Sequence, residues 1–288
     1  MIQDIAPHVY RNEYKHAEPE KDSYILIYKE NHILLKRTEE GITYPTFGEL
    51  EKWNENIYRE YTYLFSIDRQ KFYYIEELDY EELTGYTLER IQNFRSLKPQ
   101  HLAFAGITGT QLIRWYESRR YCGRCGSRMV HDEKERMMKC ENCGLMEYPK
   151  ICPAVIVGVM DGNRLLLSKY AGRTYKKYAL IAGYAEVGET IEETVRREVM
   201  EEVGLKVKNI RFYKSQPWSF TDTLLMGFYC ELEGKDEITL DKEELALAEW
   251  FEREELPDVE NEVSLTNEMI CCFKNGRNLV DKKKECGI

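Results

Sequence analysis

Short apolar runs separated by polar turns dominate the first part of the chain. Residues 24–28 and 33–35 form one such pair of runs, and residues 63–67 and 72–75 form another around the polar segment 68–71. Two apolar runs joined by a short polar segment are typical of a β-hairpin. The pattern therefore predicts that the first part of the chain is rich in β-structure.

Helical spacing takes over where this first part ends. Leu88, Ile91 and Phe94 recur at intervals of three and predict a helix that stops before Pro99. Residues 101–119 predict a second helix, and we expect an interruption near residues 106–109 because this segment contains two glycines. These two helices are expected to close the β-rich part.

The second half of the chain mixes strand and helix patterns. Strands are expected at residues 154–159, 164–168, 178–181, 207–213, 224–232 and 248–251, and a closing helix at residues 265–274. Strands and helices in this mixture indicate an α/β sandwich, in which helices cover a mixed sheet.

One helix of this half has clear start and stop signals. Thr190 and Glu193 form a capping box, and Gly204 can take the left-handed conformation that ends a helix. Apolar residues at helical spacing are expected to seat this helix on the core, namely Ile191, Val195, Val199 and Val203.

Composition limits the classes of protein to consider. A chain of 288 residues is long enough for two modest domains and a small insert. No apolar run approaches a membrane span and the first residues begin no signal peptide, so we expect no membrane association and a cytoplasmic location. The odd count of nine cysteines favours reduced thiols and metal binding. The net charge of −10 opposes non-specific binding to nucleic acids.

Three carboxylates share one face of the helix that begins after Thr190. Glu198, Glu201 and Glu202 fall within an arc of about 100°. Like charges at positions i and i+4 repel, so Glu198 and Glu202 cost stability unless a cation lies between them. Hard oxygen ligands in such a cluster suit Mg²⁺ or Mn²⁺. The alternative is an ordinary solvated acidic face.

Four cysteines predict a second metal site. Cys122 and Cys125 form one C-x-x-C pair, and Cys140 and Cys143 form another, with fourteen residues between the pairs. This spacing is typical of a zinc ribbon, in which four thiolates close a tetrahedron around one structural Zn²⁺. A redox role for either pair is the lesser alternative.

The segment from Gly183 to Leu205 carries a family pattern. The segment reads G-x5-E-x7-R-E-V-x-E-E-x-G-L, in which Val199 is joined by eight fixed positions, namely Gly183, Glu189, Arg197, Glu198, Glu201, Glu202, Gly204 and Leu205. The chain thereby resembles the Nudix hydrolases. The four-cysteine ribbon before this segment and Ser215–Phe220 after it are similar to the NADH pyrophosphatase branch, which also includes NAD-capped RNA hydrolases. The usual SQPWPFPxS motif departs here at Ser219, Thr221 and Thr223, which puts the dinucleotide preference in question.

The resemblance implies a domain plan and a set of metal ligands. It implies an N-terminal β-rich domain at residues 1–118, a zinc ribbon at 119–149 and a Nudix α/β/α sandwich at 150–288. Divalent ions would be held by the carbonyl of Ala182, Glu198, Glu202 and Glu244. Glu243 is the alternative to Glu244, but counting back from the strand at residues 248–251 favours Glu244.

The resemblance also implies roles within the motif. Glu201 or Glu202 would act on the attacking water, and the family favours Glu202. Glu189 and Arg197 are expected to form a salt bridge that holds the loop on the helix, with Gly183 and Gly204 as structural positions. Substrate-binding positions carried over from the branch are Arg95, Glu135, Tyr148, Tyr184, Gln216, Pro217, Trp218, Ser219, Phe220, Thr221, Asp222, Thr223 and Thr266. Without the family, Trp218 and Phe220 would be interpreted as packing residues.

The function implied by the branch is hydrolysis of a diphosphate bond. NADH or NAD⁺ would yield nicotinamide mononucleotide and AMP, and the NAD cap of an RNA 5′ end would be a second substrate. Arginines near the ribbon could form a basic face for RNA, or could be ordinary solvated side chains: Arg114, Arg119, Arg120, Arg124 and Arg128. Family members are commonly homodimers. Alternatives are an ADP-ribose or nucleotide-sugar pyrophosphatase, a non-catalytic Nudix-fold module, and a zinc-ribbon protein that binds nucleic acids.

Overall fold

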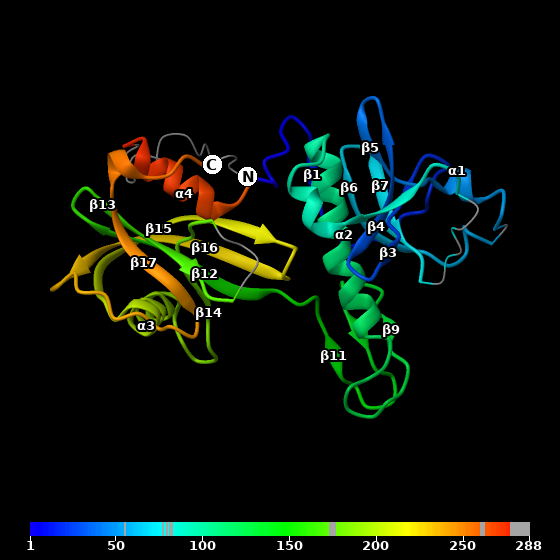
Figure 1. The fold of residues 1–288 in the computed structure, drawn as a ribbon. Coiled ribbons are helices and arrows are strands. Elements are labelled where there is room, and N and C mark those ends of the chain that lie inside the picture. Colours follow the sequence, from blue (N-terminus) through cyan, green and yellow to red (C-terminus); the bar gives the residue numbers. More distant parts are fainter. Residues whose placement is uncertain are drawn as a thin grey trace. The chain divides into compact units, whose positions relative to one another are not determined.

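The computed structural model describes residues 1–54, 56–76, 78, 80, 83–172, 177–259 and 263–276. The chain folds as two compact units (Figure 1). One contains residues 2–150 and the short segment 219–222, and the other contains Met1, residues 151–218 and the rest of the chain from Thr223. None of the helices in the described ranges combines the length and the apolar character needed to cross a membrane. Cys286, one of the nine cysteines, lies outside the described residues.

A six-stranded mixed sheet forms the centre of the second unit. Its strands run in the order β15-β16-β12-β13-β17, with β14 paired to β12. β12 and β16 are parallel, whereas the other pairings are antiparallel. The strands are β12 (Cys152–Asp161), β13 (Arg164–Tyr170), β14 (Ile181–Tyr184), β15 (Lys206–Trp218), β16 (Thr223–Glu233) and β17 (Leu245–Glu252).

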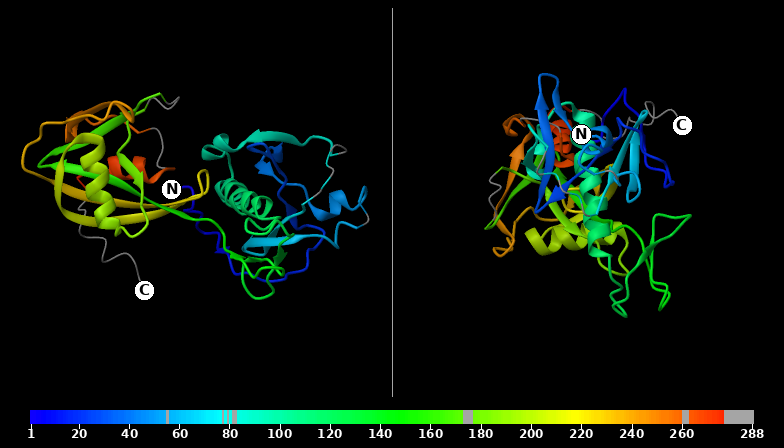
Figure 2. Two further views of the ribbon diagram at one scale, coloured as in Figure 1. Left: turned by 90° about the horizontal axis from the view of Figure 1, so that it is seen from below. Right: turned by 90° about the vertical axis from the view of Figure 1, so that its right-hand side faces the viewer.

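Two helices cover the two faces of this sheet. Successive side chains of β12 point to opposite faces, so that each face has its own apolar core. Val155, Val157 and Val159 pack with the apolar stripe of α3 (Ile191–Val203). Ile156 points to the other face and packs with α4 (Leu265–Lys274). The left view of Figure 2 shows α3 in front of the sheet and α4, in red, behind it. The predicted α/β/α sandwich with a mixed sheet is confirmed.

The helix α3 begins and ends where its local signals predict. Thr190 and Glu193 form both hydrogen bonds of the capping box, and Gly204 caps the end with φ of 69°. Two strands near this helix differ from expectation. β14 begins only at Ile181, although Ala179 forms an isolated bridge to Ser168. β15 extends to Trp218 and so includes the Ser215–Trp218 motif.

Two small four-stranded sheets make up much of the first unit. One has the order β1-β6-β7-β2, and the other has the order β3-β4-β5 with β8 on β4. The expected strand at residues 24–28 is divided between the sheets, since β2 pairs with β7 and β3 pairs with β4. The elements are β1 (Tyr10–Arg11), β2 (Tyr24–Ile25), β3 (Tyr28–Lys29), β4 (His32–Thr38), β5 (Gly41–Thr43), α1 (Phe47–Leu50), β6 (Thr62–Ile67), β7 (Gln70–Tyr74) and β8 (Thr87–Arg90).

The helix predicted from Leu88, Ile91 and Phe94 is wrong. Leu88 lies in β8, where it is opposite Leu34 of β4 and 41% exposed. Only the short 3-10 helix η1 (Ile91–Arg95) follows, with Ile91 and Phe94 buried. Spacing alone misled here, because pairing with a strand more than fifty residues away overrides a short helical pattern.

The predicted interruption of the next helix is also wrong, since α2 (Gln100–Ser118) is continuous. Its two glycines are points of close contact. A methyl group on Gly106 would stand 2.3 Å from the Tyr44 hydroxyl and 2.5 Å from the Phe94 ring, and one on Gly109 would stand 2.1 Å from Leu26 Cδ1. Glycine at these positions lets the helix approach its neighbours, at a modest cost in helix propensity.

Candidate functional site

Arg197 of α3 is the centre of a hydrogen-bond network in the family motif. Its Nε and Nη2 donate to the two oxygens of Glu189 at 2.8 and 3.0 Å, which gives the predicted ion pair. Its Nη2 also donates to the carbonyl of Tyr184 at 2.9 Å. Hydrogen bonds from Arg197 hold the pKa of Glu189 at about 2. The arginine thus fastens the loop before α3 onto the helix, as expected of a supporting ion pair.

The same guanidinium also reaches the acidic face of the helix. Nη1 of Arg197 donates to Glu198 at 2.7 Å and to Glu201 at 2.9 Å. The Glu201 side chain remains 58% exposed, whereas Glu198 and Glu202 are buried. The three carboxylates therefore differ in environment, although the sequence places them on one arc.

Glu198 lies directly against Gly183 at the end of β14. A methyl group on Gly183 would stand 1.9 Å from Glu198 Cδ, so only glycine leaves room for the carboxylate in this position. Burial raises the pKa of Glu198, the hydrogen bond and charge of Arg197 oppose the rise, and the charges of Glu201 and Glu244 add to it. A buried carboxylate of this kind is costly unless a positive partner compensates its charge.

Glu244 reaches this region because its segment is tied to the end of α3. The amide of Thr239 donates to the carbonyl of Val203 at 2.9 Å, and the amide of Asp241 donates to the carbonyl of Glu202 at 3.0 Å. Glu244 itself is exposed, and its charge acts on Glu198. This placement favours Glu244 over Glu243 as the nearby loop carboxylate.

These residues fit a hard divalent cation by their chemistry. Carboxylate oxygens are the donors that Mg²⁺ and Mn²⁺ prefer, and the space beside Gly183 admits the Glu198 carboxylate without a clash. Ala182, whose carbonyl is the remaining predicted ligand, lies in β14 opposite Ile156 of β12. Burial of two carboxylates one helical turn apart is unusual for a structural surface and typical of a site that binds cations.

The four ribbon cysteines converge in the first unit. Within the ranges that the structure describes, they are the only group of three or more His, Cys, Asp or Glu side chains whose ligand atoms all lie within 4.8 Å. The Cys122–Cys143 and Cys125–Cys140 sulfur pairs are each 3.5 Å apart. Four convergent sulfurs fit a tetrahedral Zn²⁺.

Two equivalent turns create this cluster. The amide of Gly126 donates to the carbonyl of Cys122, and the amide of Gly144 donates to the carbonyl of Cys140, each at 2.9 Å. Both glycines have positive φ, 76° and 74°. The chain between the pairs forms a hairpin of β9 (Val130–His131) and β10 (Met138–Lys139), and β11 (Met146–Glu147) pairs with the other edge of β10. The repeated C-x-x-C-G sequence explains the repeated geometry.

Several predicted substrate residues lie in the second unit. The exposed ring of Tyr184 ends β14, and its hydroxyl is 3.4 Å from that of the buried Thr223. Gln216 is fully buried: its Nε2 donates to the carbonyl of Val263 at 3.0 Å, and its Oε1 accepts from the amide of Leu265 at 2.7 Å. Pro217 is exposed and Trp218 half-buried at the end of β15, and Thr266 is half-buried in the first turn of α4. Gln216 thus connects β15 to the start of α4.

The other predicted substrate residues belong to the first unit. Arg95 stacks over the ring of Phe220, with 5.0 Å between its guanidinium carbon and the ring centroid. Phe220 and Ser219 are buried, Asp222 is half-buried and Thr221 exposed. Tyr148 is exposed, and its hydroxyl donates to Glu135 at 2.7 Å. The structure therefore brings together two pairs, Arg95 with Phe220 and Glu135 with Tyr148.

The arginines near the ribbon are engaged with neighbouring groups. Arg114 forms an ion pair with Asp222 and donates to the carbonyl of Ser219 at 2.7 Å. Partners of the other four are Glu147 for Arg119, Glu76 for both Arg120 and Arg128, and the carbonyl of Cys143 for Arg124. These contacts disfavour an open basic face.

The positioning roles of two residues could not be predicted from the sequence. Arg114 holds the turn at residues 219–222 from 105 positions away. Thr194 is fully buried in α3, and its hydroxyl donates to Glu189 at 2.8 Å. Side-chain contacts of this kind depend on the folded geometry, so no spacing rule identifies them.

Comparison with known proteins agrees with this geometry. A family model described as NUDIX domain matches residues 150–269, and one described as NADH pyrophosphatase zinc ribbon domain matches residues 117–148. The NAD-capped RNA hydrolase NudC of Mannheimia succiniciproducens is 36% identical over 196 residues, which cover 66% of this chain and 72% of that protein. The chain therefore belongs to the Nudix hydrolase family, and its zinc ribbon is that of the NADH pyrophosphatase branch.

Other relatives match a shorter part of the chain. NAD-capped RNA hydrolase NudC of Pectobacterium carotovorum is 42% identical over 151 residues, 52% of this chain and 58% of that protein. The chain thus matches less than two thirds of the length of this relative. The crystal structure of a NUDIX hydrolase from Nitrosomonas europaea is 24% identical, with a TM-score of 0.47, and covers 55% of this chain and 92% of that one.

Proposed function

We propose that this protein is a metal-dependent Nudix pyrophosphohydrolase that cleaves the diphosphate bond of NADH or NAD⁺ to nicotinamide mononucleotide and AMP. The observation that carries the proposal is a pair of buried carboxylates, Glu198 and Glu202, on α3. The neighbouring strand β14 leaves room for the Glu198 carboxylate because it has glycine at position 183. Relatives named NAD-capped RNA hydrolase support the choice of dinucleotide.

We assign two roles to these residues: some bind the cations, and one activates the attacking water. The carbonyl of Ala182 and the carboxylates of Glu198, Glu202 and Glu244 would hold Mg²⁺ or Mn²⁺. When bound, such an ion supplies the positive charge that neutralises the diphosphate. Glu202, with Glu201 as the alternative, would orient or deprotonate the water that attacks phosphorus. The engagement of Glu201 with Arg197 favours Glu202.

Substrate binding is proposed for the residues carried over from the branch. Tyr184 presents an exposed ring that suits stacking on a base. For Gln216 the contacts favour an indirect role, in which it positions the first turn of α4 and thereby Thr266. Arg95 and the turn at residues 219–222 would act together, as would Glu135 and Tyr148.

A second substrate is RNA whose 5′ end carries an NAD cap, as the printed names of the relatives indicate for those proteins. ADP-ribose or nucleotide-sugar hydrolysis is the alternative that the altered residues Ser219, Thr221 and Thr223 leave open. A non-catalytic module is disfavoured because all of the motif's glutamates are present.

The remaining assignments complete the proposal. We propose one structural Zn²⁺ per chain on Cys122, Cys125, Cys140 and Cys143, and domains at residues 1–118, 119–149 and 150–288. We also propose a cytoplasmic homodimer, on the strength of the family resemblance.

A substrate panel with two variants tests the function. Purified protein with Mg²⁺ or Mn²⁺ is assayed against NADH, NAD⁺, ADP-ribose, FAD and NAD-capped RNA. We expect NADH to be preferred among the free substrates, and Glu202→Gln to lower kcat about a hundredfold or more. Glu192→Gln, at an exposed position of the same helix, is the matched control and should retain activity. Preference for ADP-ribose, or normal turnover by Glu202→Gln, would contradict the proposal.

A further inference from the structure

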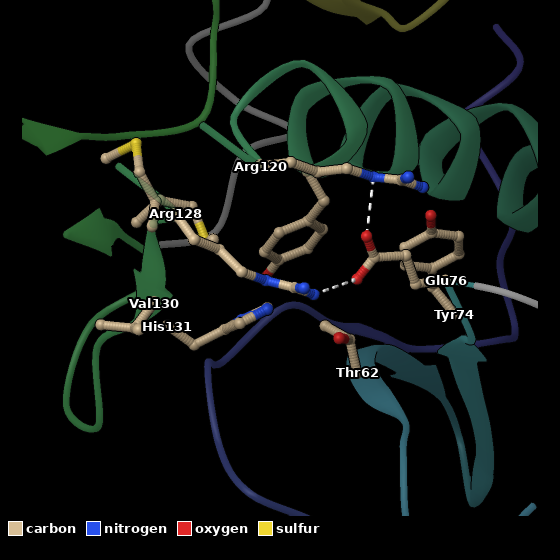
Figure 3. Close-up of a pocket in the computed structure, with 10 residues that line it drawn as sticks. Thr62, Tyr74, Glu76, Arg120, Arg128, Val130 and His131 are labelled. Atoms are coloured by element: carbon tan, nitrogen blue, oxygen red, sulfur yellow. Dashed lines mark hydrogen bonds and ion pairs between the residues drawn. The ribbon is translucent and has the colours of Figure 1, made fainter. Parts of the chain in front are cut away.

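None of the residues that line one cavity of the first unit belongs to the proposed active site. The volume of this cavity is about 240 Å³, and Figure 3 shows the side chains around it. Strand residues Thr62 and Tyr74 form one wall, the end of α2 contributes Tyr116, and Arg120 comes from the segment directly after this helix. The lining is completed by Glu76 and, from the ribbon, by Arg128, Met129, Val130, His131 and Met138.

Two arginines converge on one carboxylate in this cavity. Arg120 Nε lies 2.8 Å from one oxygen of Glu76, and Arg128 Nη2 lies 3.5 Å from the other. They approach Glu76 from two sides, as the dashed lines in Figure 3 mark. The lining therefore carries two guanidinium groups against one carboxylate. Paired guanidinium groups suit the oxygens of a phosphate, which offers more acceptors and more charge than one carboxylate.

The remaining lining suits a flat ring. The rings of Tyr116 and His131 stack with centroids 5.0 Å apart and 30° between planes. Met129 and Met138 are buried beside them and give an adaptable apolar wall. Burial lowers the pKa of His131, which favours a neutral imidazole that can offer one hydrogen-bond donor. The ring wall and the arginine pair thus belong to one cavity.

The size of the cavity limits the ligand. Pockets for drug-sized molecules are about 300 to 1,000 Å³, so a cavity of about 240 Å³ is too small to enclose a dinucleotide. The cavity suits a smaller ligand, namely one phosphate with a flat ring system beside it. We propose that this cavity binds a phosphate monoester carrying a flat ring, the chemistry of a nucleoside monophosphate, with Glu76 as the internal anion that the phosphate displaces.

Competition by Glu76 sets the direction of each test. Removing the charge of Glu76 leaves both arginines available to the ligand, so affinity rises. Removing one arginine deletes a charge-assisted hydrogen bond, so affinity falls. Glu117 is a second nearby carboxylate, which accepts a hydrogen bond from Tyr74 at 3.4 Å. It does not line the cavity and is unchanged in every variant, so its charge does not affect the comparison. The proposal does not depend on the proposed hydrolase activity.

Calorimetric titration of the full zinc-loaded chain, without added Mg²⁺ or Mn²⁺, measures the binding. AMP is the probe, with inorganic phosphate as the anion alone and adenosine as the ring alone. We expect AMP to bind more tightly than phosphate, and adenosine to bind weakest. Arg128→Gln should weaken AMP binding about tenfold or more, and Glu76→Gln should tighten it. Arg69→Gln, in the exposed turn between β6 and β7, is the matched control and should leave the affinity unchanged.

The same titration can overturn the proposal. Equal affinity for AMP and adenosine would remove the role of the phosphate. An AMP affinity that neither Arg128→Gln nor Glu76→Gln changes by twofold would place the binding elsewhere. Circular dichroism shows whether Arg128→Gln folds, and if it does not, the Glu76→Gln variant decides alone. Glu76→Gln keeps both arginines, and AMP binds it more tightly only if the phosphate contacts this arginine pair.

Discussion

The carboxylate of Glu198 lies so close to Gly183 that a methyl group on this glycine would stand 1.9 Å from Glu198 Cδ. Alanine at position 183 must therefore displace the carboxylate or the end of β14. Displacing a catalytic group by about 1 Å can lower the rate about a hundredfold. We expect Gly183→Ala to lower kcat/KM for NADH by about that factor, measured under saturating Mg²⁺.

Thermal unfolding of the same variant separates this effect from misfolding. Val187→Ala, at a fully exposed position between β14 and α3, should behave as the parent protein. Normal turnover by Gly183→Ala would show that the position of Glu198 does not limit the reaction.

The ion pair between Glu189 and Arg197 predicts a pH dependence of stability. Hydrogen bonds from Arg197 depress the pKa of Glu189 to about 2, below its ordinary value of 4.5. A depressed carboxyl pKa stabilises the fold above the ordinary value, and this contribution is lost as the pH falls toward the depressed value. The Glu189→Gln variant has no carboxyl group at this position and therefore lacks this contribution to stability. We therefore expect the parent to be more stable than Glu189→Gln at pH 7, with a difference that shrinks between pH 4.5 and about 2.

Urea unfolding at pH 7, 5, 4 and 3 measures this difference in free energy. Other acid-sensitive groups are common to both proteins, so they cancel in the comparison. A difference that stays constant across this range would mean that the charge of Glu189 contributes nothing.

Two glycines of α2 predict unequal effects of alanine. Gly106 faces the Tyr44 hydroxyl and the rigid Phe94 ring, whereas Gly109 faces the tip of the Leu26 side chain, and all three side chains are buried. Alanine favours a helix by about 1 kcal/mol, and overpacking a rigid site costs about 1 to 3 kcal/mol. Gly106→Ala should therefore destabilise the protein more than Gly109→Ala, measured as the shift in Tm. Equal shifts would mean that the rings yield as easily as the leucine.

Loss of the ribbon metal predicts destabilisation of the first unit. Structural zinc sites contribute directly to folding. Cys125→Ser should lower the zinc content from one ion per chain and lower the Tm of this unit by about 10 °C. Cys152→Ser, outside the ribbon, is the control and should keep its zinc. Full zinc content in Cys125→Ser would exclude this cysteine as a ligand.

Features with local causes could be predicted from the sequence. The bounds of α3 follow from a capping box and a terminal glycine, both within the helix's own neighbourhood. The cysteine turns likewise depend on a short repeated sequence. The spacing of Glu198 and Glu202 placed both on one face, and the pairing of Arg197 with Glu189 followed from the motif.

Features with distant causes could not be predicted in the same way. Leu88 became a strand residue because Leu34 lies opposite it, and α2 stays continuous because Tyr44, Phe94 and Leu26 pack against its glycines. The pairing of Arg120 and Arg128 with Glu76 joins three separate segments. Such contacts require the whole fold, because no local propensity encodes them.

The alternation of β12 between two cores makes the central strand intolerant of changes in length. Successive side chains of a strand point to opposite faces. Deleting one residue between Val155 and Val159 would reverse the faces of the strand residues on one side of the deletion, so that valines which support α3 would point toward α4. An insertion in the turn between Asp161 and Arg164 would lengthen only the loop and spare both layers. Homologous chains should therefore vary in length at this turn and keep the number of residues in β12 constant.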